Sequence, residues 1–554
     1  MSAGRDILAE RGIMPKPRPT ADGTRRPRST PVRAVASKPE IELGTGPATI
    51  RAVAEAINGR QLPDVYVSAG QVVHVEEVSG AVTAAAGDED SPLPVTASEV
   101  VPPLLAGLLA DHTYTYKMKS RKGDDGQPER YPEETTPVVA SLAASLARKT
   151  WPGLPPLLGI AGAPVLRPDG TLLQTRGYDE ATGLYLASKV PLEHVPDKPT
   201  TTQVEQARTF LLDQFLPDFP WVEPADRANY LGVLVTPILR RYLHSLIPFV
   251  VFTATMPGSG KTILTSGPGM LYGQRVLTWT HSDEELRKSI TSVLADPVGT
   301  VIFDNLAEGT VIDSPVLARL ITDRTWADRL LGGNKTAAYA NDRLWCATGN
   351  NLRLGGDMAG RTVQVRLNPD MPEPEQRDQG NFAIPNLDQW VLNPANQRQI
   401  LWHLLVLVLD WTRSGSPRCP GVPMRQFTPW ADAIGGFLAH HGVEGFLANA
   451  GAVRDSDDEN ATWTAFLARW RAIHGDEWKT ANEILISADV PLMGGPDQWE
   501  GQFLTDGRGK FPTVVSLGKR LAGQADRYRG SYVLRRQTDR HNNVRTWRVE
   551  EYAG

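Results

Sequence analysis

The residues best suited to do chemistry lie in "TATMPGSGKTIL", residues 253–264. Its end matches most of G-x-x-x-x-G-K-S/T, the pattern of a loop whose backbone N–H groups surround phosphates. In such a loop Lys261 would reach the β- and γ-phosphate oxygens, and the Thr262 hydroxyl would ligate Mg²⁺. Thr255 replaces the pattern's first glycine, which mainly eases the exit from the strand, so no ligand is lost. The expected nucleotide-binding residues are Pro257, Gly258, Ser259, Gly260, Lys261, Thr262 and Ile263.

The segments around this run have the order that a phosphate loop requires. Residues 247–255, "IPFVVFTAT", form a continuous apolar run, as expected of a strand buried on both faces of a parallel sheet. The residues from Lys261 onward can begin a helix. A simple Gly/Ser turn that ends in Gly-Lys-Thr is the alternative, and the strand, turn and helix in sequence favour the phosphate loop.

A second predicted strand supplies a carboxylate. In "VGTVIFDNL", residues 298–306, an apolar run ends at Asp304, which we expect to hold the Mg²⁺ shell through water. Asn305 stands where such sites usually have a glutamate that orients the attacking water. The catalytic base therefore remains open among Glu284, Glu285, Glu308 and Asn305 itself. A solvated helix face is an equally good interpretation of Glu284 and Glu285.

A third predicted strand, "DRLWCATGNN" at residues 342–351, ends in two asparagines. Asn350 is the first choice for a polar sensor of the γ-phosphate, and Asn351 is the second. Arg361 follows eleven residues after Asn350. An arginine at this place could project from one subunit onto a neighbour's nucleotide and stabilise charge in the transition state. A surface arginine in a salt bridge is the alternative.

These motifs together resemble the superfamily 3 type of AAA+ helicase. The stretches "ATGNNLRLGGDMAGRTVQVRL", "PVLRPDGTLLQTRGYDEATGLY" and "GVEGFLANA" look like the helicase or primase-helicase proteins of phages, prophages and integrated elements of bacteria. The likeness spans roughly residues 150–550 and is strongest over the ATPase core. It implies a homo-hexameric ring that uses ATP and Mg²⁺ to translocate on single-stranded DNA while the element replicates.

The resemblance also implies a basic hairpin just before the sensor strand. Lys335, in "LLGGNKTAAYANDRLW", is then the candidate for a DNA-phosphate contact, and a plain β-turn lysine is the alternative. Many relatives carry a primase domain, which needs clustered carboxylates for two metal ions. The acidic run "GDEDS" at residues 87–91 has a turn-like setting instead. We expect no primase activity here, and a separate primase or other replication protein as a partner.

The C-terminal segment is predicted to be a nucleic-acid-binding unit. Three predicted helices and two strands follow in the order of a winged helix, and Thr480 with Glu483 forms a predicted capping box. From Arg508 to Arg548 there are eleven Lys/Arg and two acids, an electrostatic footprint for duplex or single-stranded DNA. A protein-docking winged helix is the alternative. The expected phosphate contacts are Lys519, Arg520, Arg535, Arg536 and Arg540.

The chain of 554 residues is predicted to be an α/β protein with a P-loop AAA+ core built on a parallel sheet. Two cysteines, Cys346 and Cys419, provide no disulfide framework and no Cys-x-x-Cys zinc pair, and no apolar run is long enough to span a bilayer. We expect a soluble protein of the bacterial host cytoplasm.

The leading hypothesis is an ATP-dependent DNA helicase, and the alternatives are a replication initiator that melts an origin and a nucleotide-gated regulatory or defence ATPase. The expected organisation is a disordered basic arm (1–45), a small α+β domain (46–148), β-hairpins (149–200), the AAA+ core with preceding helices (201–415), a helical lid and acidic linker (416–460) and a winged helix (461–554).

Overall fold

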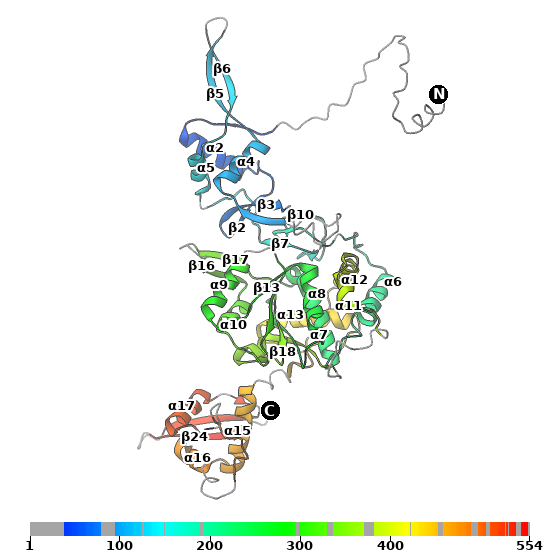
Figure 1. The fold of residues 1–554 in the computed structure, drawn as a ribbon, viewed down its shortest axis with the longest axis vertical. Coiled ribbons are helices and arrows are strands. Elements are labelled where there is room, and N and C mark those ends of the chain that lie inside the picture. The colour runs from blue at the N-terminus through cyan, green and yellow to red at the C-terminus, as the bar shows by residue number, and fades with distance from the viewer. Residues whose placement is uncertain are drawn as a thin grey trace, which may run out of the picture.

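The computed structural model of the chain shows several units, each with its own apolar core (Figure 1). Most of the predicted basic arm and the "GDEDS" run lie outside the residues that it describes. The described residues are 38–78, 95–123, 127–148, 150–188, 190, 192–294, 298–329, 336–369, 382–421, 423–451, 458–488, 497–505, 510–526, 528–529, 531–538 and 544–551.

The first unit packs three helices against two small sheets. Strand β1 (Glu40–Glu42) pairs in parallel with β5 (Tyr114–Lys122), and β5 pairs with β6 (Pro128–Glu134) in a hairpin that projects from the helices in Figure 1. The second sheet has the order β2 (Val65–Ser68), β3 (Gln71–Glu77) and β4 (Val95–Glu99). The helices, which bury leucine, valine and alanine side chains between them, are α2 (Gly46–Asn58), α4 (Pro102–His112) and α5 (Val139–Leu146).

Short hairpins connect this unit to the core. Strands β8 (Val165–Leu166) and β9 (Leu172–Leu173) pair around the Pro-Asp-Gly turn, and β10 (Gly177–Asp179) pairs with β11 (Leu184–Leu186) around the Ala-Thr-Gly turn. Strand β7 (Gly159–Ala161) adds to β11 in parallel. Both turns thus lie where the sequence pattern predicts them.

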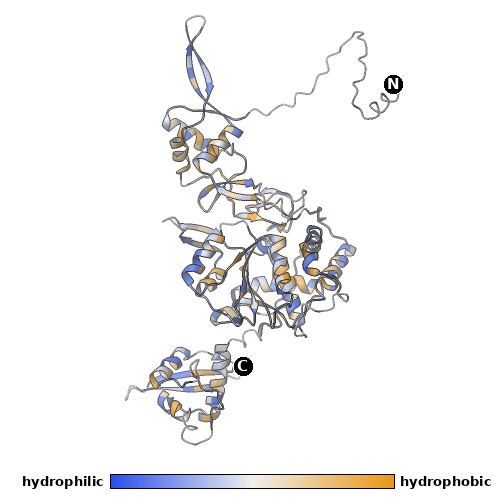
Figure 2. Cartoon of the chain, in the orientation of Figure 1, coloured by the Kyte–Doolittle hydropathy of each residue, from blue (hydrophilic) through white to orange (hydrophobic). Residues whose placement is uncertain are grey.

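The core is built on one five-stranded parallel sheet, which confirms the predicted α/β class. Its strand Phe249–Ala254 is buried at every residue, and Figure 2 shows apolar residues gathered in the interior of this unit. Burial of each large apolar side chain contributes about 1.5–3 kcal/mol, so the buried strands contribute strongly to the stability of this unit. The order across the sheet is β13 (Gln274–Leu277), β14 (Thr300–Leu306), β18 (Leu344–Asn350), β12 (Phe249–Ala254) and β20 (Thr362–Leu367).

Helices pack around this sheet. The long helix α7 (Pro224–Leu243) is buried along most of its length and contacts β20 and α8 (Lys261–Tyr272). The remaining helical segments of the core are α6 (Thr201–Thr209), the π-helix η1 (Phe210–Phe215), α9 (Asp283–Val293), α10 (Pro315–Thr322), the 3-10 segments η2 (Gly356–Arg361) and η5 (Arg425–Phe427), α11 (Leu387–Leu392), α12 (Pro394–Arg413) and α13 (Thr428–His440). The small strand pairs are β15 (Val311–Ile312) with β19 (Arg353–Leu354) and β16 (Thr325–Arg329) with β17 (Thr336–Ala340).

The C-terminal unit has its own core of Trp, Phe and Leu side chains. Helix α16 (Ala481–Ala488) begins at the predicted capping box, which is confirmed: Thr480 N donates to Glu483 Oε2 at 2.7 Å, and Glu483 N donates to Thr480 Oγ1 at 3.2 Å. Its other elements are α15 (Asp458–His474), β21 (Lys479–Thr480), α17 (Val514–Gln524), β22 (Tyr528–Arg529), β23 (Tyr532–Thr538) and β24 (Arg545–Glu551). The sheet order is β21-β24-β23-β22.

None of the helices in the described ranges has both the length and the apolarity needed to cross a membrane.

Candidate nucleotide site

The loop between β12 and α8 needs glycine at two positions. Gly258 has a φ of 71° and Gly260 a φ of 90°, both in the left-handed region that residues with a Cβ atom rarely adopt. A Cβ at Gly260 would also lie 3.3 Å from Cε1 of Phe219, which packs under the loop. The backbone therefore takes the tight turn that the Gly-Ser-Gly sequence predicts, and α8 begins at Lys261.

Thr255 fits the loop without strain. Thr255 does not have a positive φ, so the backbone conformation at this position does not require glycine. Its hydroxyl donates to Asn368 Oδ1 at 2.8 Å, and its N–H donates to the carbonyl of Leu367 at 3.3 Å. The departure from the sequence pattern is thus absorbed by contacts with the end of β20.

Lys261 and Asn350 meet at the carboxyl edge of the sheet. Lys261 Nζ donates to Asn350 Oδ1 at 2.6 Å and lies 3.4 Å from Ser259 Oγ. Partial burial lowers the pKa of Lys261, because the charged ammonium loses water without gaining a carboxylate partner. An ammonium in this state gains most from an anionic ligand, and a phosphate is the ligand that the loop amides favour.

Asp304 lies at the same edge, on the far side of β18. The pairing of β14 with β18 shifts register between Phe303 and Leu306, and Asn305 there has a φ of 53°. Thr348 of β18 holds this bulge: its hydroxyl donates to Asp304 Oδ1 at 2.5 Å and accepts the Asn305 N–H at 2.8 Å. The bulge exposes both Asp304 and Asn305 at the sheet edge.

Among the glutamates proposed as a base, Glu308 is joined to the loop. Asn351 Nδ2 donates to Glu308 Oε1 at 2.7 Å, and the Asn351 N–H donates to the carbonyl of Ala254 at 3.0 Å. Glu284 and Glu285 lie in the first turn of α9, where both pair with Lys288 at 2.9 and 2.8 Å. Acidic side chains in the first turn of a helix complement its dipole. This setting favours the interpretation of Glu284 and Glu285 as part of a solvated helix face.

Arg361 lies at the opposite edge of the sheet from Lys261. It directly precedes Thr362, which pairs with Phe249 at the amino end of β12, whereas the loop follows the carboxyl end at Ala254. Five residue steps along a strand correspond to about 16 Å. Its guanidinium donates to the carbonyl of Ala318 at 3.1 Å and to Asp357 at 3.0 Å, and its side chain is 17% exposed. Arg361 therefore cannot reach the phosphate loop of its own chain.

A buried charge network supports the strand next to the loop. Asp226 of α7 has a fully buried side chain and accepts from Arg366 of β20, whose guanidinium also pairs with Glu223. Asn449 Nδ2 donates to Asp226 Oδ1 at 2.9 Å, the same oxygen that accepts from Arg366 Nε. Burial raises the pKa of Asp226 despite the neighbouring Arg366. No local pattern in the sequence marks this network.

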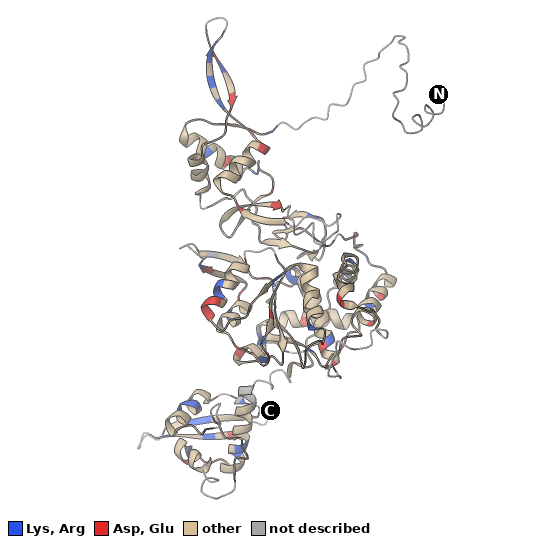
Figure 3. Cartoon of the chain, in the orientation of Figure 1, with Lys and Arg blue, Asp and Glu red and all other residues tan. Residues whose placement is uncertain are grey.

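The predicted DNA contacts differ in their surroundings. Lys335 and Arg540 lie outside the described residues. Lys519 on α17 and Arg536 on β23 are exposed, and Arg520 donates to the carbonyl of Thr505 at 3.5 Å. Arg535 instead pairs with Asp526 at 2.9 Å and Glu550 at 3.0 Å. Figure 3 shows Lys and Arg on both the strands and the helices of this unit.

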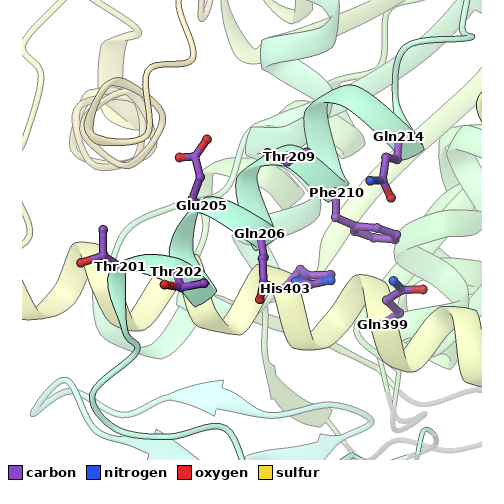
Figure 4. Close-up of a pocket in the computed structure, with 9 residues that line it drawn as sticks. All are labelled: Thr201, Thr202, Glu205, Gln206, Thr209, Phe210, Gln214, Gln399 and His403. Atoms are coloured by element: carbon purple, nitrogen blue, oxygen red, sulfur yellow. The ribbon is translucent and has the colours of Figure 1, made fainter.

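A separate cavity of ≈ 620 Å³ lies between α6, η1 and α12 (Figure 4). Glu205, Gln206 and Phe210 line it from one side, and Gln399 and His403 line it from α12. The rings of His403 and Phe210 are tilted by 33° with centroids 4.6 Å apart, and burial lowers the pKa of His403 to about 4. No residue of the Lys261 loop lines this cavity, so it is distinct from the sheet-edge site.

The donors at the sheet edge suit a Mg-nucleotide. Hydroxyl and carboxylate oxygens are the ligands that Mg²⁺ prefers, and Thr262 and Asp304 are both exposed there. Two left-handed glycines allow the backbone to approach a phosphate closely. The residues present therefore fit ATP with Mg²⁺.

Comparisons with known proteins give only distant likenesses. No protein-family model matches the sequence, and no curated protein matches it. The chain is similar to the apo structure of the NrS-1 C-terminal region (11% identity, 82% of this chain, 100% of that chain, TM-score 0.35). It is also similar to the SCCmec type IV Cch active helicase (10%, 88%, 98%, 0.35) and the JCV helicase (15%, 46%, 72%, 0.22). Since these TM-scores are low, the function of this chain rests on its own geometry.

Proposed function

We propose that this chain is an ATP- and Mg²⁺-dependent DNA helicase that replicates a phage or mobile element. The observation that carries the proposal is the convergence of Lys261, Asn350 and Asp304 at one edge of a parallel sheet. Strand β18 lies between β14, which carries Asp304, and β12, which leads into the Lys261 loop. Its residues contact both sides: Asn350 accepts from Lys261, and Thr348 donates to Asp304. A lysine, a polar sensor and a metal-side carboxylate are the parts that phosphoryl transfer from ATP requires.

Each residue has a defined task in this mechanism. The backbone amides and helix N-terminus of residues 257–263 would hold the phosphates, with Lys261 on the β- and γ-oxygens. Thr262 and, through water, Asp304 would hold Mg²⁺, which when bound neutralises charge on the phosphates. Asn350 would exchange its contact with Lys261 for the γ-phosphate. Glu308, joined to the site through Asn351, is our choice over Glu284 and Glu285 for orienting the attacking water.

The proposed assembly is a ring, because Arg361 is on the wrong edge to act within its own chain. In a ring of identical subunits, the amino edge of one sheet can face the loop of its neighbour, and Arg361 would then stabilise transition-state charge there. Asp357, which holds Arg361, is 64% exposed and also pairs with Arg425 at 3.4 Å. Arg361 can therefore exchange a solvated partner for a phosphate.

The proposed DNA contacts come from two places. The C-terminal unit has the element order of a winged helix, with α17 as the recognition helix and β23–β24 as the wing. Of the cations predicted to contact DNA, Lys519 and Arg536 are the exposed ones among the residues that the structure describes. The β16–β17 hairpin precedes the sensor strand, as the proposed channel loop would.

The test combines DNA-stimulated ATP hydrolysis with strand displacement, for wild type and Lys261→Ala. We expect Lys261→Ala to lower hydrolysis by at least about 100-fold, the loss typical when one positioned transition-state donor is removed. Lys288→Ala is the matched control, because this lysine pairs only with the exposed Glu284 and Glu285 among the described residues. Hydrolysis that survives in Lys261→Ala would contradict the site. Stimulation without unwinding would instead favour the initiator or the regulatory ATPase.

A further inference from the structure

Three potential metal ligands meet where helices α12 and α13 pack together, in a place that the proposed ATPase mechanism does not use. One ligand atom from each of Asp410, His440 and His441 lies within 4.8 Å of the other two. His440 Nε2 is 2.9 Å from Asp410 Oδ2, and His441 Nδ1 is 4.0 Å from the same oxygen. The side chain of His441 is 3% exposed, whereas those of His440 and Asp410 are 24% and 30% exposed.

The orientation of His441 is fixed from behind. Its Nε2 lies 3.0 Å from the carbonyl oxygen of Leu407, which can only accept, so Nε2 carries the proton in the neutral ring. The lone pair on Nδ1 then points toward Asp410, and 4.0 Å is beyond hydrogen-bond distance. A histidine whose other nitrogen donates to a backbone carbonyl is the usual arrangement of a metal ligand.

We propose that Asp410 Oδ2, His440 Nε2 and His441 Nδ1 bind one divalent transition-metal ion of the zinc class. Ligand atoms of a tetrahedral zinc site are roughly 3.4 Å apart, given bonds of about 2.1 Å. The two separations from Asp410 Oδ2, 2.9 and 4.0 Å, bracket that value, and the two histidine nitrogens lie within 4.8 Å of each other. Side-chain rotations can therefore bring all three atoms to zinc-binding distance. Two imidazoles with one carboxylate suit Zn²⁺ better than Mg²⁺, which prefers oxygen.

The surroundings favour a structural ion with one position open to solvent. Ser414 Oγ is 3.4 Å from His440 Nε2, and the exposed side of the cluster leaves room for water as a fourth ligand. Arg208, a cation near the cluster, donates to the backbone carbonyl of His441 at 3.1 Å and pairs with Glu205, so its charge is directed away from the three ligand atoms. The ion would join the last turn of α12 to the end of α13.

The experiment is a competition titration of tag-free, chelator-stripped protein with Zn²⁺ against a chromophoric chelator, without nucleotide. We expect one equivalent to bind to wild type, and affinity to fall by at least about 10-fold in Asp410→Asn and in His440→Gln. Both substitutions keep a hydrogen-bonding group in place, and circular dichroism checks that the variants fold. His281→Ala, which removes an exposed histidine elsewhere in the core, is the matched control and should bind as wild type does.

Two outcomes would overturn the proposal. The first is no bound equivalent in folded wild type, which would leave Asp410 and His440 as an ion pair between helices. The second is equal binding by wild type and both variants, which would place the ion elsewhere. Co²⁺ adds an independent readout, because a site with these ligands gives visible d–d absorption that the variants should lose. Lys261→Ala should retain the ion, so the result does not depend on the proposed ATPase.

Discussion

Replacing Thr348 by valine tests whether the bulge at Asp304 positions a metal ligand. Valine has nearly the same shape, so Thr348→Val removes a buried hydroxyl, 4% exposed, without opening a cavity. It takes away a hydrogen bond to a carboxylate, worth about 1.5–3 kcal/mol, and the acceptor of the Asn305 N–H, worth about 1 kcal/mol. Because Asp304 and Asn305 are exposed and regain water, we expect a net local loss of about 2–3 kcal/mol.

Hydrogen exchange is the suitable assay for this local effect. The chain folds as several units, so one unfolding free energy for the whole molecule is not well defined. A loss of about 2–3 kcal/mol corresponds to about 30- to 150-fold faster exchange of the Asn305 amide, read in peptides that cover β14. We also expect Mg²⁺-dependent ATP binding to weaken by about 10- to 100-fold, as when other partners of metal ligands are removed.

Thr300→Val is the control, on strand β14, which carries Asp304 and Asn305. The Thr300 hydroxyl is buried and has no hydrogen-bond partner among the described residues, so its removal should leave exchange and nucleotide binding unchanged or slightly improve stability. The reasoning is refuted if Thr348→Val speeds exchange as expected and still binds Mg·ATP like wild type. Asp304 would then be held in place for a reason other than metal binding.

The remaining predictions concern the loop, the buried network and pH. Gly260→Ala should abolish Mg·ATP binding in calorimetry, because the backbone at this position has a φ of 90° and an added Cβ would approach Phe219 closely. Thr255→Gly should change the affinity for Mg·ATP by no more than about 2-fold. Arg366→Met should lower the melting temperature of the core, because it leaves the buried charge of Asp226 unpaired and costs about 3–5 kcal/mol of folding free energy. The double variant with Asp226→Asn should recover part of that free energy. His403 stays neutral in the folded core with its pKa near 4 but takes up a proton near pH 6.5 when unfolded, so acidification from pH 6.5 to 4.5 should reduce stability. Partial exposure of His403 limits this loss of folding free energy to about 2 kcal/mol or less. If the melting temperature of His403→Gln depends on pH as that of wild type does, His403 is not the source of the pH dependence.

The sheet-edge site could be predicted from sequence where the signals are local. Continuous β-branched and aromatic runs mark buried strands, and glycine spacing marks the turn before Lys261, because each signal depends on neighbouring residues. The carboxyl ends of parallel strands share one edge, so placing Lys261, Asp304 and Asn350 near one another required only that the three strands be parallel. The five-stranded parallel sheet meets that requirement.

Other features depend on strand order and on partners far along the chain. The role of Thr348 requires that β18 lie beside β14 and that the register shift before Leu306. Asp226 and Asn449 are separated by 223 positions, a distance over which no pattern in the sequence operates. The basic stretch that predicts DNA contacts ends at Arg548, and Glu550, just beyond it, pairs with Arg535 across the hairpin. Counting charges along the chain misses such cross-strand neighbours.

The location of Arg361 at the amino edge of the sheet divides the proposed machinery between two faces of each molecule. A lone chain would bind nucleotide normally yet lack one cation at the transition state, so turnover per molecule should rise with protein concentration while nucleotide affinity stays constant. Mixing Lys261→Ala with Arg361→Ala subunits should then restore some hydrolysis, because a few interfaces would unite an intact loop with an intact arginine.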